Sequence, residues 1–369
     1  MSVMRQIALL EAGCQPWHSH IIAASGNRFA YAATLAIYIY EMDRKQNKFC
    51  LQSIMSEHKN TITCLTWHQT NEDCLASASA DPQICIWNVA QHVLLACLKT
   101  PLAIPTLITW YPEEKDSLVY LESQGPLYLW RFSKSGNCSS GNYGTQLKEI
   151  QPFLSGVTRI QWNSLESHHL ALGHQDGTVS LYLKSQKPKR HIKLNCGADD
   201  NTINTENCAI TGLEWDPLSP HYLLIAVQNS CLLLADISGN TLHTIMIFNM
   251  PSKASTAQTI AWIPNAPGMF ISGDYETGVL RVWTVSQRGP LENICLKHNG
   301  FHAIHVVSCN QKQSSMHGKT ENPKVNPKRT SYCGRGYAVP TAKIACLFVD
   351  GGVGLYDLKK CSWDFFRDT

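Results

Sequence analysis

A short apolar segment ending in tryptophan recurs along this chain at nearly even intervals. The five copies are TITCLTW ending at Trp67, PTLITW at Trp110, VTRIQW at Trp162, ITGLEW at Trp215 and AQTIAW at Trp262. Their spacings are 43, 52, 53 and 47 residues. Periods of this length indicate a repeat architecture in which each unit is one small sheet. A chain of 369 residues could otherwise form two ordinary domains, so the repeat decides between the two.

A second spacing is constant inside each unit. Each tryptophan is followed by another alternating apolar segment, whose last residue lies 20 residues on in four units and 21 in the fifth. The pairs are Trp67 and Trp87, Trp110 and Trp130, Trp162 and Tyr182, Trp215 and Ala235, and Trp262 and Trp283. A run such as CLASASA separates the two segments, and a run such as LLACLK follows them. Alternation between turn signals predicts four antiparallel strands per unit.

Two further units lie at the chain ends. RFAYAAT and LAIYIYEM supply strands of the first, and FHAIHVVSC and IACLFVDGGVGLYDL supply strands of the last. We therefore predict an all-β, seven-bladed β-propeller of four-stranded antiparallel blades, with residues 1–369 forming one domain. The predicted blades are 14–56, 57–100, 101–154, 155–197, 206–250, 255–298 and 300–369. The last blade still needs a fourth strand, which either RQIALLE or CSWDFFRD could supply.

Polar residues mark the turn that precedes the second aromatic segment. Asp81, Asp176 and Asp350 lie six residues before its end, and Gln124 and Asn229 hold the same place in weaker units. In the second unit, His58, Ser77, Asp81 and Trp87 fall where WD40 repeats carry a hydrogen-bonded His, Ser, Asp and Trp set. The unit resembles a WD40 repeat, and the resemblance implies that the four residues pin the blade. A buried Asp is tolerable there only if neighbouring donors satisfy it.

The resemblance to WD-repeat proteins extends along most of the chain. Segments such as GCQPW at 13–17, LEWDPLSPHYLL at 213–224 and DGGVGLYDLKK at 350–360 are similar to the first propeller of long WD-repeat proteins that carry a second propeller. This implies that the chain is the N-terminal part of a longer protein. WD40 propellers usually close with an N-terminal strand, so the resemblance slightly favours RQIALLE for the last blade.

Composition excludes several classes of function. A net charge of +3 and a pI near 8.1 give no basic footprint for nucleic acid. No apolar run approaches the length of a membrane span, and no signal-peptide core is visible. Fifteen cysteines without a CxxC pair are typical of a reducing compartment. We therefore expect a cytoplasmic chain with protein partners, without nucleic acid, membrane insertion or a small-molecule substrate.

Three loops interrupt the repeat, at 133–145, 195–208 and 310–337. The longest lies inside the seventh unit and carries Lys324, Lys328, Arg329 and Arg335 among its six basic residues, against one acidic residue. It is either a basic docking loop or a solvated disordered insertion, and composition favours the insertion.

Chemistry-bearing motifs are few. His58, Ser77 and Asp81 could be drawn as a catalytic triad, but the repeat assigns them to the blade. Two zinc sites can be imagined, at Cys14, His18 and His20, and at His298, His302, His305 and Cys309, yet neither has the paired spacing of structural zinc. No phosphate-binding glycine motif occurs. The sequence shows no acids and bases that would converge in the channel, so we predict no catalytic residue, metal or cofactor.

The predicted function is that of a non-enzymatic scaffold which binds protein partners through its faces and loops, since a rigid ring with divergent loops offers a preorganised surface. One alternative is the N-terminal propeller of a trafficking or ciliary coat-type subunit. The other is a hydrolase in the propeller channel, which the lack of converging groups disfavours.

Overall fold

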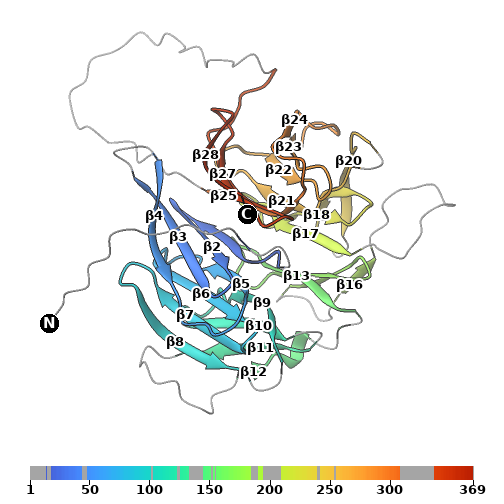
Figure 1. Cartoon of the computed structure of the whole chain (residues 1–369). Helices are drawn as coiled ribbons and strands as arrows, with labels where there is room; N and C mark the ends of the chain where they lie inside the picture. The colour runs from blue at the N-terminus through green and yellow to red at the C-terminus, as the bar shows by residue number, and fades with distance from the viewer. Residues whose placement is uncertain are drawn as a thin grey trace, which may run out of the picture.

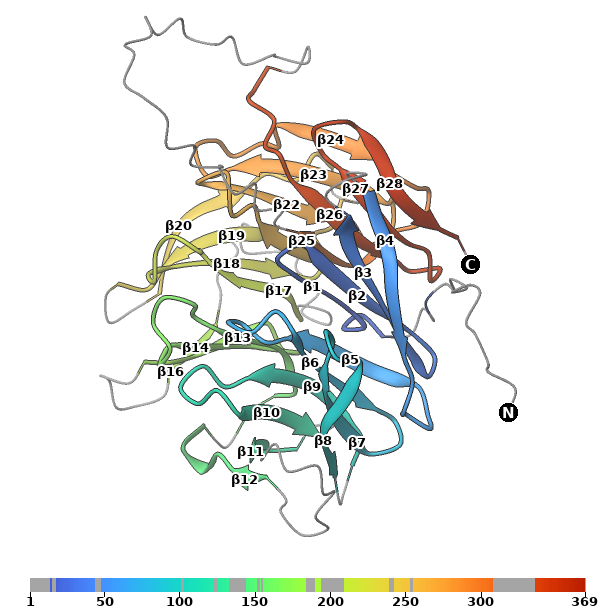
Figure 2. The same cartoon turned by 90° about the vertical axis from the view of Figure 1, so that its left-hand side faces the viewer.

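The computed structural model describes residue 14 and residues 18–43, 48–100, 103–122, 125–132, 144–150, 153, 155–183, 190–193, 209–238, 242–252, 255–307 and 336–368. The described strands form seven four-stranded antiparallel sheets arranged in a ring (Figures 1 and 2). We number the sheets as blades 1 to 7 in chain order. The predicted fold class, an all-β seven-bladed β-propeller, is confirmed.

The first three blades lie in residues 22–146. Blade 1 contains β1 (Ile22–Ser25), β2 (Arg28–Ala33), β3 (Ala36–Asp43) and β4 (Lys48–Met55). Blade 2 contains β5 (Ile62–Trp67), β6 (Cys74–Ser79), β7 (Gln83–Asn88) and β8 (Val93–Lys99). Blade 3 contains β9 (Pro105–Trp110), β10 (Ser117–Glu122), β11 (Leu127–Arg131) and β12 (Thr145–Gln146), and the short 3-10 helix η1 (Lys148–Ile150) follows.

The other four blades complete the ring. Blade 4 contains β13 (Val157–Trp162), β14 (Leu170–His174), β15 (Thr178–Tyr182) and β16 (Arg190–Lys193). Blade 5 contains β17 (Ile210–Trp215), β18 (Tyr222–Val227), β19 (Leu232–Asp236) and β20 (His243–Phe248). Blade 6 contains β21 (Thr259–Trp262), β22 (Met269–Gly273), β23 (Val279–Thr284) and β24 (Glu292–Cys295). Blade 7 contains β25 (Phe301–Val307), β26 (Lys343–Phe348), β27 (Val353–Asp357) and β28 (Ser362–Arg367).

The last blade closes with a strand from the C-terminal end of the chain. β28 pairs antiparallel with β27, so CSWDFFRD supplies the fourth strand and the slight preference for RQIALLE was wrong. The reason is local: β1 already gives blade 1 its own first strand, and every blade is made from contiguous chain. Side-chain packing then joins blade 7 to blade 1, with the Phe365 ring 4.7 Å from the Tyr40 ring. The backbone N–H of Cys14 also donates to Gly351 O.

The tryptophans that revealed the repeat end the innermost strands and join neighbouring blades. In four of the five, the indole N–H donates to a backbone oxygen in the innermost strand of the preceding blade. The bonds are Trp67 to Ala23 O at 3.2 Å, Trp110 to Thr66 O at 3.2 Å, Trp215 to Gln161 O at 3.0 Å and Trp262 to Glu214 O at 3.3 Å. Because the indole is buried, the bond satisfies a donor that would otherwise be costly.

A second series of bonds uses threonine hydroxyls of the innermost strands. Thr63 donates to Pro105 O at 2.8 Å, Thr158 to Ile210 O at 2.7 Å and Thr211 to Ala257 O at 2.9 Å, and Thr259 Oγ1 accepts from the Ile304 N–H at 3.2 Å. Both series skip the junction between blades 3 and 4. There the Trp162 indole N–H has no partner, and Thr106 donates to Leu121 O in its own blade.

This difference predicts unequal effects of one substitution at two equivalent positions. Trp215→Phe removes a made hydrogen bond and should lower the free energy of unfolding by about 1 kcal/mol more than Trp162→Phe, which removes a buried donor that has no partner. Urea denaturation of both variants measures the difference. Equal losses would show that the indole bonds contribute nothing to the blade junctions.

The described cysteines are mostly apolar core residues. Burial raises the pKa of the Cys14, Cys64 and Cys346 thiols above its ordinary value, to about 12 for Cys64. Such thiols are protonated and unreactive at neutral pH. Cys231, however, is disulfide-bonded, which the expected reducing compartment would disfavour.

Candidate functional site

The structure brings together three of the four residues predicted to pin blade 2. Ser77 lies on β6 and Trp87 on β7, and the Trp87 indole N–H donates to Ser77 Oγ at 2.8 Å. His58, from the segment before β5, places Nε2 2.7 Å from the same oxygen. Burial lowers the pKa of His58, although the nearby Asp81 carboxylate opposes this. His58 is therefore a neutral imidazole at neutral pH, and Ser77 is the centre of a buried polar cluster.

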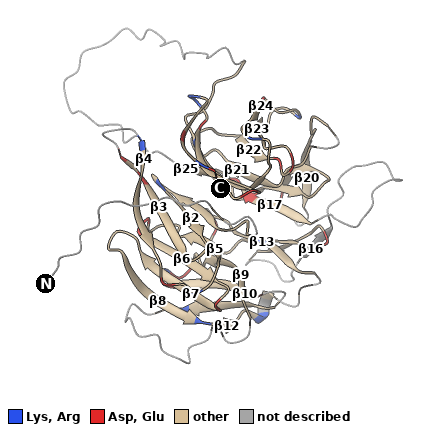
Figure 3. Cartoon of the chain, viewed as in Figure 1, with Lys and Arg blue, Asp and Glu red and all other residues tan. Residues whose placement is uncertain are grey.

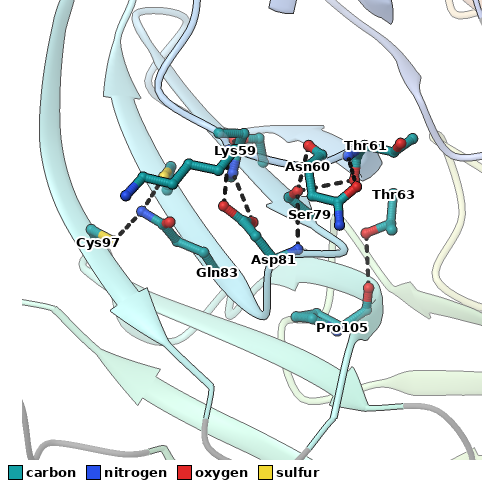
Figure 4. A network of polar contacts seen from close by, with 12 residues as sticks. Lys59, Asn60, Thr61, Thr63, Ser79, Asp81, Gln83, Cys97 and Pro105 are labelled. Carbon is teal, nitrogen blue, oxygen red and sulfur yellow. Dashed lines mark hydrogen bonds and ion pairs between the residues drawn. The ribbon is translucent and has the colours of Figure 1, made fainter. Parts of the chain in front are cut away.

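The fourth residue, Asp81, holds the turn between β6 and β7 (Figure 4). Its Oδ2 accepts from the Lys59 backbone N–H at 3.0 Å. Its Oδ1 lies 3.6 Å from His58 Nδ1, which is longer than a hydrogen bond. Ser79 Oγ donates to both Asn60 O at 2.8 Å and Thr61 O at 2.9 Å. The turn is thus tied to the segment that enters the blade.

This geometry bears directly on the triad reading of the same residues. Ser77 is fully buried, and its hydroxyl is shared by His58 and the Trp87 indole. A nucleophile must instead be exposed to substrate, with an oxyanion site beside it.

Asp176 and Asp350 occupy the same turn in two other blades, with different partners. Asp176 Oδ1 accepts from the Thr178 hydroxyl and backbone N–H, at 2.7 and 3.1 Å. The same blade holds a buried pair, in which His174 Nε2 lies 2.6 Å from Ser180 Oγ. Asp350 Oδ1 accepts from the Gly352 N–H at 3.0 Å. Turn capping is therefore what these positions share, and in blade 2 Asp81 also lies 3.6 Å from His58 of the buried cluster.

Asp350 also takes part in a small ionic cluster at the outer part of blade 7. Lys297 forms an ion pair with Asp350 and lies 2.5 Å from Asp368 Oδ1. Burial opposes charge on Lys297, but its hydrogen bonds to Asp350 and Asp368 raise its pKa overall. Asn299 donates to Asp350 Oδ2 at 2.6 Å. The cluster links the chain after β24 to the turn before β27 and to the end of β28.

The sequence analysis missed the most buried ion pair of the described residues, which lies in blade 6. Asp274 Oδ2 is 2.8 Å from Arg281 Nη2, and the two side chains are 0% and 4% exposed. Asp274 also accepts from the backbone N–H groups of Glu276 and Thr277 at 3.0 and 3.1 Å. It lies nine residues before Trp283, whereas the other aspartates lie six residues before the second aromatic, so the constant spacing did not find it. An arginine in the middle of the apolar run VLRVW was the available signal.

The docking loop cannot be placed. Lys324, Lys328, Arg329 and Arg335 lie outside the described residues, between β25 and β26 of blade 7. The role of this loop stays a prediction.

The two zinc sites considered in the sequence lie partly within the described residues. Among the residues that the structure describes, no group of three or more His, Cys, Asp or Glu side chains is placed to hold a metal. Cys309 falls outside that part of the chain. In the same part, no helix is long and apolar enough to cross a membrane.

A cavity of about 150 Å³ lies inside the ring, where the innermost strands meet. Its lining comes from β9, β13, β17, β21 and β25 and from the segment before β1. Half of the lining residues are polar, and four ionisable residues are among them: His20, Arg159, Glu214 and His305. The expectation that no acids and bases converge in the channel was therefore wrong. Strand alternation was the available signal, since Arg159 and Gln161 share one face of β13.

The four groups have unusual protonation. Burial lowers the pKa of Arg159 to about 10, although Glu214 opposes this, and burial raises the pKa of Glu214 to about 8, although Arg159 opposes this. Burial and the positive Arg159 lower the pKa of His305 to about 4 and that of His20 well below its ordinary value. At neutral pH Arg159 is thus charged, while the other three are mostly neutral.

Hydrogen bonds fix the orientation of these groups. Arg159 Nη1 lies 2.9 Å from His20 Nε2 and donates to Thr158 O at 2.9 Å. Gln161 Nε2 donates to Glu214 Oε2 at 3.2 Å. Since arginine is always a donor, His20 Nε2 is the acceptor. The cavity therefore presents one cation held by neutral neighbours.

Comparison with known proteins agrees with this architecture. Residues 49–88, which cover most of blade 2, match the family model "WD domain, G-beta repeat". The chain is 21% identical to human Gem-associated protein 5 over 291 residues, which is 67% of this chain and 18% of that protein. It is also 21% identical to the GATOR2 complex protein WDR24 of Dictyostelium discoideum over 265 residues, 59% of this chain and 24% of that protein. The aligned region thus spans less than a quarter of either relative.

A solved structure supports the fold over nearly the whole chain. The β-propeller domain of Cps50 (Swd1) from Myceliophteria thermophila superposes with a TM-score of 0.64 at 12% identity, covering 94% of this chain and 96% of that domain. At this identity the likeness concerns the fold alone. The chain is a seven-bladed β-propeller, and its segment from β4 to β7 is similar to a WD repeat.

Proposed function

We propose that this chain is a non-enzymatic scaffold whose propeller binds protein partners through one exposed face. The supporting observation is a pair of exposed leucines on neighbouring loops: Leu165, between β13 and β14, is 50% exposed, and Leu218, between β17 and β18, is 59% exposed. Both loops follow an innermost strand, so they emerge on the same side of the ring. Tyr222, at the start of β18, is 37% exposed. We call these three residues the leucine face.

The two loops are held in place instead of being free to move apart. The Asn163 side chain donates to Pro220 O at 3.0 Å, which ties the loop of blade 4 to the loop of blade 5. Asn163 Oδ1 also accepts from the backbone N–H groups of Leu165 and Glu166 at 2.8 and 3.0 Å. A fixed loop loses little conformational entropy when a partner binds, which favours affinity.

Charged residues are spread over the described part of the chain. In Figure 3, lysine and arginine (blue) and aspartate and glutamate (red) occur as short scattered segments. The net charge of +3 agrees with this. Two of the relatives also bear on the proposal, because "Gem-associated protein" and "GATOR2 complex protein" are names of proteins that work in assemblies. The expected cytoplasmic location and the coat-type alternative stay predictions.

The test is partner capture with and without the leucine face. Proteins cross-linked to the full chain and competed by excess free chain define its saturable partners. The double substitution Leu165→Glu and Leu218→Glu should weaken their capture at least about tenfold, since charge in an apolar contact loses burial on both sides. The matched control is Ile245→Glu on β20, because Ile245 is 49% exposed but lies on an outer strand. Equal capture by the double variant and the wild type would rule out this face.

A further inference from the structure

We propose that the cavity inside the ring is a binding site for a single carboxylate group, held by Arg159 with Glu214 beside it. The site is separate from the leucine face, and the proposal does not depend on it. It rests on where the cation lies, on what surrounds it and on the room next to it.

The Arg159 guanidinium forms no ion pair with a carboxylate in the described part of the chain. Its Nη1 is engaged by His20 and by Thr158 O, which are both uncharged partners. Glu214 is the acidic residue of the cavity, and Gln161 holds one of its oxygens. Arg159 is only partly exposed, and a partly desolvated cation without an anion is costly because the loss of hydration is not repaid. A bound anion would supply the missing counter-charge.

The size and charge of the site select the anion. About 150 Å³ accommodates a ligand of a few heavy atoms or several waters. One positive charge matches a monoanion, and a planar guanidinium matches a carboxylate through two parallel N–H bonds. Because Glu214 is protonated at neutral pH, its O–H can donate to the same carboxylate. This favours a carboxylate over a phosphate dianion.

The protonation of the cavity predicts how binding depends on pH. The lining residues of β9 and β21 that face the cavity, Leu107, Ile108, Thr259 and Ile260, carry no titratable group. The titratable groups lie on the other sides: Arg159 on β13, Glu214 on β17, His305 on β25 and His20 before β1. His18 is near His20, and His302 is near His18. Above neutral pH, Glu214 is the first of these to change charge, at a pKa of about 8. Its deprotonation adds a negative charge beside Arg159, so carboxylate affinity should fall as the pH rises through that value.

The experiment is calorimetric titration of the full chain with sodium propionate at pH 6.5, with chloride keeping the ionic strength constant. We expect one saturable site. Arg159→Gln should lower the affinity more than about tenfold, as expected for loss of a charge-assisted pair. Arg131→Gln is the control for charge, because Arg131 is exposed at the surface and paired with Glu114. Propionate binding that Arg159→Gln leaves unchanged would overturn the proposal.

A second variant keeps the test valid if Arg159→Gln fails to fold. Glu214→Gln resembles the protonated acid, so this variant should bind propionate at pH 6.5. Its affinity should stay constant between pH 6.5 and 9.5, whereas the affinity of the wild type should fall over the same range. A decline of the same size in Glu214→Gln overturns the assignment. A capped Gly-Glu-Gly peptide titrated in parallel distinguishes the source of the carboxylate. Tighter binding of the peptide than of propionate indicates a partner's side chain, and binding of propionate alone indicates a free small acid. No saturable binding of either probe overturns the site.

Discussion

Replacing Asp274 with alanine should lower the free energy of unfolding by about 3–5 kcal/mol, which is the cost of leaving a buried charge without its partner. Arg281 is 4% exposed, and its only carboxylate partner in the described residues is Asp274. The substitution also removes the acceptor for the Glu276 and Thr277 backbone N–H groups, so the turn between β22 and β23 loses its cap. Urea denaturation of the full chain, followed by fluorescence, measures the loss.

Two further variants separate the buried pair from ordinary surface charge. Glu114→Ala breaks the exposed pair with Arg131, whose side chains are 40% and 56% exposed, and should cost less than about 1 kcal/mol. The double variant Asp274→Ala with Arg281→Met removes both charges together and should recover much of the loss, because no unpaired charge remains. A double variant that is as unstable as Asp274→Ala would place the effect in the turn cap and not in the ion pair.

The same pair predicts a dependence on acid. Burial would raise the pKa of Asp274, but the hydrogen bonds from Thr277, Arg281 and Thr256 lower it overall, below the ordinary value of 3.8. A folded-state pKa below the unfolded one means that the stabilisation is fully present above pH 3.8 and is lost as the pH falls further. The wild type should therefore lose stability below that pH more steeply than the double variant does.

Replacing Ser77 with alanine should lower the free energy of unfolding by about 2–4 kcal/mol, because one hydroxyl serves two buried partners. The Trp87 indole N–H loses its acceptor, and His58 Nε2 loses its partner. Neither group can turn to solvent, since both residues are buried. The midpoint of urea denaturation and the near-ultraviolet circular dichroism of Trp87 report the change.

Blade 6 supplies the matched control for this effect. Ser272 is buried like Ser77 and accepts from the Trp283 indole at 2.9 Å, but no histidine among the described residues shares its hydroxyl. Ser272→Ala should therefore cost about half as much as Ser77→Ala. Equal losses in the two variants would mean that His58 contributes nothing to the cluster and that the four-residue set is not a unit.

The period of the tryptophans was enough to predict the blades. An innermost strand that packs against the neighbouring blade ends in a large side chain that carries one hydrogen-bond donor. This role is filled in the same way by Trp67, Trp110, Trp215 and Trp262. The turn aspartates followed from the same spacing. These residues are determined by their position within one strand and one blade, so the alternation of apolar residues and the constant spacing within each unit revealed them.

What the chain brings together across the ring was decided only by the tertiary structure. Arg159, Glu214 and His305 come from three blades and meet because innermost strands face a common axis, which no spacing along one strand can express. The closing strand, by contrast, is the local pairing of β28 with β27, and the sequence left it open because both ends of the chain offered a candidate strand. The repeated unit and the number of units could be predicted from the amino-acid sequence, since these depend on neighbours along the chain. Contacts between residues far apart in sequence required the closed ring.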